Sequence, residues 1–322
     1  MTSKIVSVFF GLVLLFSGYC YASNESMDAV DIERVAEGGE LKEFVGKIKM
    51  GDVDMARRLI NEASDKTTKS IMQGELYLLT DNVEALCSHD YYTTVSRYYR
   101  YACQLQSGIY TDMRGINEKS YLYRTNELLK AVSKSNENSV AYRLIDNSDI
   151  DYGDKVFALA RFIGYETANE YCKNNNELVF ECEFVRLSKS SSIRLDDLNL
   201  SVGYEYSQAL YVVLLAIESG SPDLHRLMRY FGMVPSCSTD YYICNLIKAN
   251  ASIYKNDERS FEINMAQAES LWSMNEQNLV LRLNAYVHFC RKEKLMRTLD
   301  VWKASEEEYE YWQNEFDKVC SN

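Results

Sequence analysis

Apolar residues recur at helical spacing along most of this chain. From Val53 to Ala63 they return every three or four positions, which places them on one helical face, and Asp52 stands where a cap is expected. The same spacing predicts helices over 121–132 and 279–289. The hairpin dipeptides Asn-Gly and Asp-Gly do not occur. The pattern therefore predicts an all-α fold, with helices of about 10 to 20 residues joined by short polar turns.

The N-terminus has the layout of an export signal. A single lysine precedes an apolar run over 5–16, which is shorter than the roughly 20 residues that cross a bilayer. We expect residues 1–22 to be a signal peptide that is cleaved near Ala22. The alternative is lipid modification of Cys20, although a lipidated cysteine normally follows a small residue and Tyr19 precedes this one. The prediction is an exported protein, periplasmic or extracellular, without stable membrane insertion.

Eight cysteines remain after such a cleavage, an even number suited to an oxidising compartment. They fall into four local pairs, separated by 16, 10, 7 and 30 positions, with longer gaps between pairs. Zinc sites need cysteines or histidines closer together than these, so we expect disulfides and no metal. The predicted pairs are Cys87 with Cys103, Cys172 with Cys182, Cys237 with Cys244, and Cys290 with Cys320.

Two pairs of segments show the same order of helix, short turn and helix. Residues 136–144 align with 275–283, and residues 49–56 are arranged like 216–224. This arrangement resembles the helical hairpins of tetratricopeptide and Sel1-like repeats, in which a small residue ends the first helix. The resemblance implies an irregular right-handed α-solenoid of helical hairpins, stapled by disulfides as in some secreted Sel1-like proteins. An unrelated all-α fold is the alternative.

Domain boundaries are faint. Residues 23–38 are polar and acidic, and we expect them to form a frayed N-terminal segment. Residues 39–322 are predicted to form the helical repeat domain. The only serine run lies near residue 190, where we expect either a bend or a sub-boundary.

Charge and missing motifs exclude several classes of function. The chain has 35 Lys and Arg against 47 Asp and Glu, a formal charge of −12 that becomes −13 once residues 1–22 are removed. Such a charge repels nucleic acid and anionic membranes. The His-Glu-x-x-His, Gly-x-Ser-x-Gly and phosphate-loop motifs are absent, and the three histidines lie far apart in the sequence. We therefore expect no cofactor and identify no catalytic residue.

Tyrosine is over-represented, with 25 residues, six of them in three adjacent pairs. A tyrosine ring suits both cores and protein interfaces, and we expect most of these residues to be in the core. Neighbouring helical residues point in different directions, so one member of a pair should be partly exposed. The predicted partner-binding residues are Tyr92 or Tyr99 in one cluster and Tyr241 or Tyr242 in the other.

These observations favour protein binding, with an acidic surface that attracts a basic partner protein. A periplasmic immunity protein and an envelope scaffold are two forms of this hypothesis. One alternative is an exported hydrolase of cell-wall or other polysaccharide, which would need two carboxylates about 5 to 9.5 Å apart across a cleft. Another is a secreted effector or adhesin.

Overall fold

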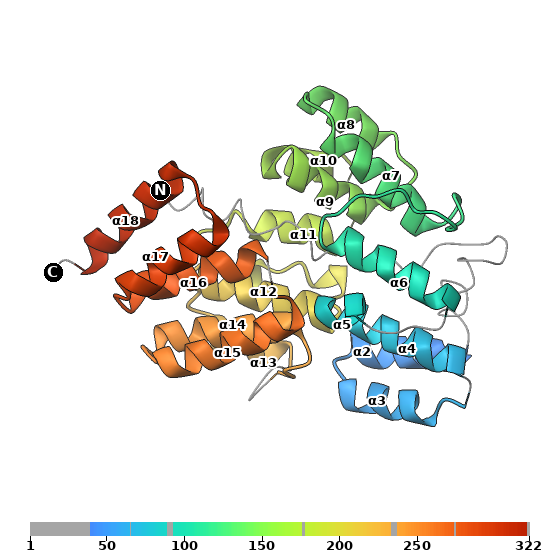
Figure 1. Ribbon diagram of the computed structural model, residues 1–322, viewed down its shortest axis with the longest axis horizontal. Coiled ribbons are helices and arrows are strands. Elements are labelled where there is room, and N and C mark those ends of the chain that lie inside the picture. Colours follow the sequence, from blue (N-terminus) through green and yellow to red (C-terminus); the bar gives the residue numbers. More distant parts are fainter. Residues whose placement is uncertain are drawn as a thin grey trace.

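The computed structural model describes residues 39–64, 66–88, 93–175, 178–232, 237–273 and 275–320. The predicted signal peptide and the polar segment 23–38 lie outside the described residues. Within these ranges the regular structure is entirely helical, which confirms the predicted all-α class (Figure 1).

The first group of helices starts at the lower right of Figure 1 with α2, α3 and α4, and α5 and α6 lie above them. Asp52 caps α3 as predicted, because its carboxylate accepts the backbone N–H of Met55 at 3.2 Å. α4 packs against α2, α3, α5 and α6. The helices are α2 (Gly39–Lys49), α3 (Val53–Glu62), α4 (Lys66–Leu79), α5 (Val83–Ser88) and α6 (Thr93–Gln106).

A second group stands at the upper right of Figure 1 and continues from α6 through α7. Helix α9 is at its centre and contacts α7, α8, α10 and α11. The helices are α7 (Tyr121–Ser133), α8 (Asn138–Asp146), α9 (Tyr152–Phe162), α10 (Tyr165–Asn175) and α11 (Phe180–Leu187), followed by the short 3-10 helices η2 (Leu195–Asp197) and η3 (Leu200–Val202).

The third group fills the left half of Figure 1. Helix α12 is almost wholly buried, as its long apolar run requires, and it packs against α11, α13 and α14. The helices are α12 (Tyr206–Glu218), α13 (Leu224–Tyr230), α14 (Tyr242–Tyr254), α15 (Glu258–Leu271), α16 (Glu276–His288), α17 (Lys292–Trp302) and α18 (Glu306–Cys320).

The first and third groups also meet directly, through α2 with α12 and α5 with α15. At Gly51 the backbone is left-handed, with φ +81°, and the Tyr206 ring lies where a Cβ would be, so only glycine fits without strain. Next to this contact, Lys49 donates to Glu205 at 2.8 Å. Elements more than 150 residues apart thus share one core.

Four disulfides join the cysteine pairs that the spacing predicted. Their Cα–Cα separations are 5.4 to 5.9 Å, which is normal for disulfides. Cys87–Cys103 ties α5 to α6, and Cys290–Cys320 encloses α17 and α18. The other two are Cys172–Cys182 and Cys237–Cys244. No helix in the described part of the chain combines the length and apolar character needed to cross a bilayer.

Candidate functional site

Tyr99, one of the two alternatives in the first predicted partner-binding pair, is fully buried, which contradicts exposure of this ring. Its ring lies on Gly74 of α4, where a Cβ would overlap it. Its hydroxyl lies within hydrogen-bond distance of two acceptors for its single proton, the Glu75 carboxyl at 2.8 Å and the Ile71 carbonyl at 3.1 Å. Tyr98 is buried as well, because helices α4 and α5 cover α6 on more than one side.

Tyr241 and Tyr242 are also buried, which corrects the second predicted pair. Tyr241 is the extended residue before α14 and donates to the Ile48 carbonyl of α2 at 2.6 Å. Tyr242 begins the helix, and its hydroxyl contacts Asn278 at 2.8 Å and Asn275 at 3.0 Å. The two rings point apart as predicted, yet each enters a different part of the core. Tyr92 lies outside the described residues.

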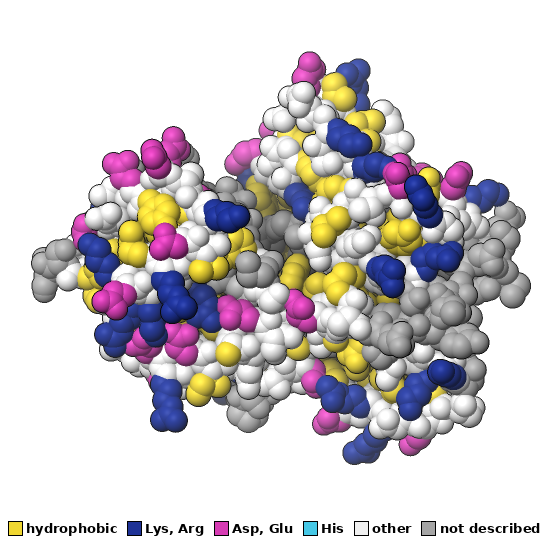
Figure 2. All heavy atoms as spheres, in the orientation of Figure 1, with side chains coloured by type: hydrophobic (Ala, Val, Ile, Leu, Met, Phe, Trp, Pro, Cys, Tyr) yellow, Lys and Arg dark blue, Asp and Glu magenta, His cyan; other side chains and the backbone are white. Residues whose placement is uncertain are grey.

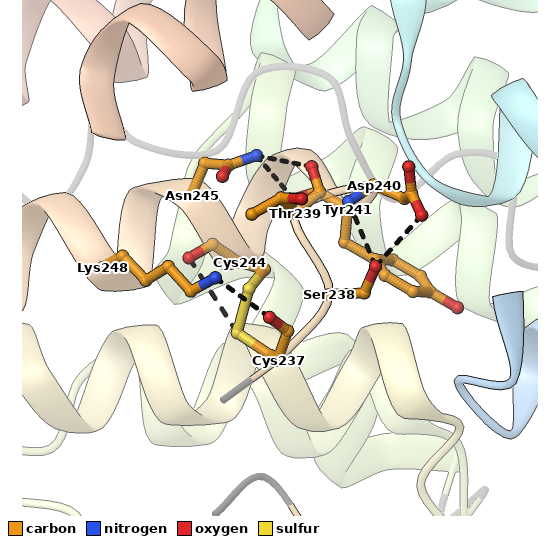
Figure 3. Close-up of a disulfide and its surroundings, with 8 residues drawn as sticks. All are labelled: Cys237, Ser238, Thr239, Asp240, Tyr241, Cys244, Asn245 and Lys248. Carbon is orange, nitrogen blue, oxygen red and sulfur yellow. Dashed lines mark hydrogen bonds between the residues drawn. A yellow bond between two sulfur atoms is a disulfide. The ribbon is translucent and has the colours of Figure 1, made fainter. Parts of the chain in front are cut away.

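The turn before α14 is held by the Cys237–Cys244 disulfide (Figure 3). Lys248 donates to the Cys237 carbonyl at 3.0 Å, and the Asn245 amide donates to the Thr239 carbonyl at 2.9 Å. These contacts fix the backbone that directs Tyr241 into the core. The cysteines and tyrosines of this turn are therefore structural.

A cleft of about 630 Å³ opens between α15, α16 and α17. That volume is within the range of small-molecule sites. Figure 2 shows Lys and Arg side chains gathered beside Asp and Glu side chains over these helices. The lining residues include Glu262, Glu269, Arg282, Tyr286, Lys294, Arg297, Val301 and Trp302.

Arg282 lines the cleft and pairs with Glu262 and Glu269, the two acidic residues of α15 that also line it. Its guanidinium bonds Glu269 through two nitrogens, at 2.5 and 2.8 Å, and Glu262 at 3.0 Å. Glu262 also accepts Lys294 at 2.8 Å. Partial burial would raise the pKa of Glu262, but hydrogen bonds from Lys294 and Arg282 lower it overall. Both carboxylates are thus charge-compensated.

This arrangement does not suit glycoside hydrolysis. A general acid needs a carboxyl group whose pKa is raised, so that it is protonated near neutral pH. Glu262 has the opposite shift, and one arginine bridges the two carboxylates of the cleft. Among the described residues, no three His, Cys, Asp or Glu side chains gather where they could hold a metal ion.

Helix α18 presents a second unusual surface. Trp312 and Phe316 bury its inner face, while Tyr311 on its outer face is 41% exposed. The helix contains six acidic residues and one lysine. Within the described chain, Glu315 pairs with Lys318 at 2.6 Å, and the other five acidic residues of α18 form no ion pair. The solvent face of α18 is therefore acidic and carries an exposed aromatic ring.

Neither surface was identified from the sequence. The cleft depends on three helices meeting, which a linear pattern does not show. The exposed ring of α18 could have been found in the segment Tyr309-Glu310-Tyr311-Trp312. Helical spacing there places Tyr309 and Trp312 on the packed side and Tyr311 away from it. The chain matches no protein-family model, no curated protein and no solved structure.

Proposed function

We propose that this is an exported protein-binding protein whose outer face of α18 contacts a basic partner protein. The observation that carries the proposal is the exposed Tyr311 ring among acidic side chains, of which only Glu315 forms an ion pair within the described chain, on a helix fixed at both ends. Tyrosine is favoured at interface hot spots because its ring buries much area with little loss of conformational freedom.

The acidic side chains around Tyr311 have the placement of an interface rim. Glu307 and Glu308 precede Tyr311 by one helical turn, and Glu315 follows it by one turn. An acidic rim accelerates encounter with a basic partner and excludes acidic ones. Acids in the first turn also stabilise α18 through the helix dipole, but Glu310 and Asp317 lie beyond that turn.

The rigidity of α18 supports this role. The Cys290–Cys320 disulfide fixes its C-terminal end. At the other end, Ser305 and Glu308 form a reciprocal cap: Ser305 N–H donates to the Glu308 carboxylate at 2.7 Å, and Glu308 N–H donates to the Ser305 hydroxyl at 3.3 Å. A helix held in its bound conformation loses little entropy on association.

Export and a solenoid arrangement belong to the same proposal. Four disulfides favour an oxidising compartment, to which a signal peptide in residues 1–22 would deliver the chain. Contacts of α2 with α4, α7 with α9, α12 with α14 and α16 with α18 are those that stacked helical hairpins would make. They support a tetratricopeptide or Sel1-like architecture. An immunity protein and an envelope scaffold would both bind a partner protein with such an architecture.

The test is affinity capture from an envelope extract with the purified, oxidised protein. We expect a basic protein to be enriched at physiological salt and more strongly at low salt, since screening weakens exposed charge pairs. Tyr311→Ala should reduce its capture at least tenfold, as for an interface hot spot. Glu307→Gln with Glu310→Gln should reduce the salt dependence.

The matched control is Tyr254→Ala, because Tyr254 is 64% exposed and lies on α14 rather than α18. This variant should capture the partner as the wild type does. Equal losses in the Tyr311 and Tyr254 variants would contradict the proposal, as would an extract that yields no specific protein at either salt concentration.

A further inference from the structure

Arg297 is the uncompensated cation of the α15–α17 cleft. Lys294, Arg297, Thr298 and Val301 lie on one face of α17, at intervals of three and four residues, and all four line the cleft. Lys294 is bonded to Glu258 and Glu262, each at 2.8 Å. Arg297 is exposed, and its guanidinium forms no hydrogen bond or ion pair with any described residue.

The cleft carboxylates, in contrast, already accept hydrogen bonds from cationic side chains on every oxygen. Both oxygens of Glu269 accept Arg282. One oxygen of Glu262 accepts Arg282, and the other accepts Lys294 and the Tyr286 hydroxyl, the latter at 3.2 Å. A cationic ligand would meet carboxylates whose charge Arg282 and Lys294 already compensate. An anionic ligand finds Arg297 free, and a guanidinium binds a carboxylate with two parallel hydrogen bonds.

One part of the wall is apolar, although Ser273, Asn278 and Thr298 also line the cleft. Val301 is 61% exposed and stands beside Trp302, which is half-buried, with Leu279 contributed by α16. An exposed valine beside an indole ring in a concave site favours a ligand with an apolar group. The charged and apolar parts of the wall therefore suit different ends of one ligand.

We propose that this cleft binds an organic carboxylate with an adjoining apolar group, with Arg297 on the carboxylate and Trp302 and Val301 against the apolar part. Two sources share this chemistry: the free carboxyl end of a peptide with an apolar last residue, and a small apolar acid. No residue of α18 lines the cleft, so the site is independent of the proposed protein-binding face.

The experiment titrates the oxidised protein with acetyl-Ala-Phe and with the same dipeptide as its C-terminal amide. Binding is followed by calorimetry and by tryptophan fluorescence, in which Trp302 is the more accessible reporter because Trp272 and Trp312 are buried. We expect the acid to bind at least tenfold more tightly than the amide. Acetyl-phenylalanine distinguishes the sources: weaker binding than the dipeptide indicates a peptide end, and equal binding indicates a small acid.

Arg297→Gln should weaken binding of the acid at least tenfold and leave the amide unchanged. The control is Arg58→Gln, which removes another exposed arginine, on α3, and should have no effect. Trp302→Ala should weaken both ligands. The proposal is overturned if the acid shows no saturable binding at millimolar concentration, if acid and amide bind equally, if Arg297→Gln binds the acid normally, or if inorganic phosphate binds as tightly as the acid.

Discussion

The hydroxyl of Tyr211 on α12 donates a hydrogen bond to the carboxylate of Asp81, 130 residues earlier in the chain, at 3.2 Å. Gln106 of α6 donates to the other carboxylate oxygen at 3.0 Å. The preceding carbonyl, that of Thr80, accepts the backbone N–H of Tyr242 at 3.1 Å. The turn between α4 and α5 thus joins three helices that the sequence alone does not bring together.

Burial raises the pKa of Asp81 to about 7, although the hydrogen bonds from Tyr211 and Gln106 lower it in part. The unfolded chain releases this proton near the ordinary value of 3.8. The contribution of Asp81 to stability is therefore complete below about pH 4 and is lost as pH rises towards 7.

Asp81→Asn should remove this dependence, because its amide stays neutral and asparagine tolerates the left-handed backbone at φ 55°. We expect the variant to gain up to about 4 kcal/mol relative to wild type between pH 4 and pH 7. Urea unfolding across that range measures the difference, with Asp54→Asn on the exposed side of α3 as control. A difference that does not change with pH would show that Asp81 is ionised in the folded protein.

Gly74→Ala should destabilise the protein by about 1 to 3 kcal/mol, because its Cβ would meet the Tyr99 ring. Gly46→Ala is the matched control: Gly46 is also helical, and nothing lies within 4 Å of its Cβ position. That substitution should stabilise the protein by about 0.5 to 1 kcal/mol through helix propensity alone. Thermal unfolding of the two variants decides whether Tyr99 is a core residue; similar effects would contradict its burial.

Tyr242→Phe should cost about 1 to 3 kcal/mol, because it leaves the buried Asn278 side chain without its donor. Tyr311→Phe, on the exposed face of α18, should change the unfolding free energy by less than about 0.5 kcal/mol. Denaturant titration compares the two. Equal, small effects would indicate that Tyr242 is not held in the core.

The disulfides should differ in their contribution to stability. Cys290–Cys320 closes a loop of 30 residues and Cys237–Cys244 a loop of 7. In the chain-entropy model these loops are worth about 4 and about 2 kcal/mol. Replacing both cysteines of each pair with serine tests this in denaturant. Hydrogen exchange should also show faster exchange in α18 for the Cys290 and Cys320 variant, and unchanged exchange there would contradict the proposed rigidity.

The helical class and the disulfide pairs could be predicted from the sequence because both depend on local spacing. The α5–α6 hairpin and the α17–α18 segment between Cys290 and Cys320 illustrate this. Tyr99 and Tyr241 could not be placed correctly, since their burial depends on Gly74 and on α2, which contact them only in the folded chain. The cleft likewise requires α15, α16 and α17 to converge.

Site-specific photo-crosslinking in living cells tests most directly whether the α18 face binds a partner. We predict that a benzoylphenylalanine at position 311 of the exported protein gives one discrete adduct with a basic protein. The same group at position 254, which is more exposed than position 311, should give none. The adduct should disappear when Glu307 and Glu310 are changed to lysine. No adduct at position 311, or the same adducts from both positions, would contradict a binding role for this face.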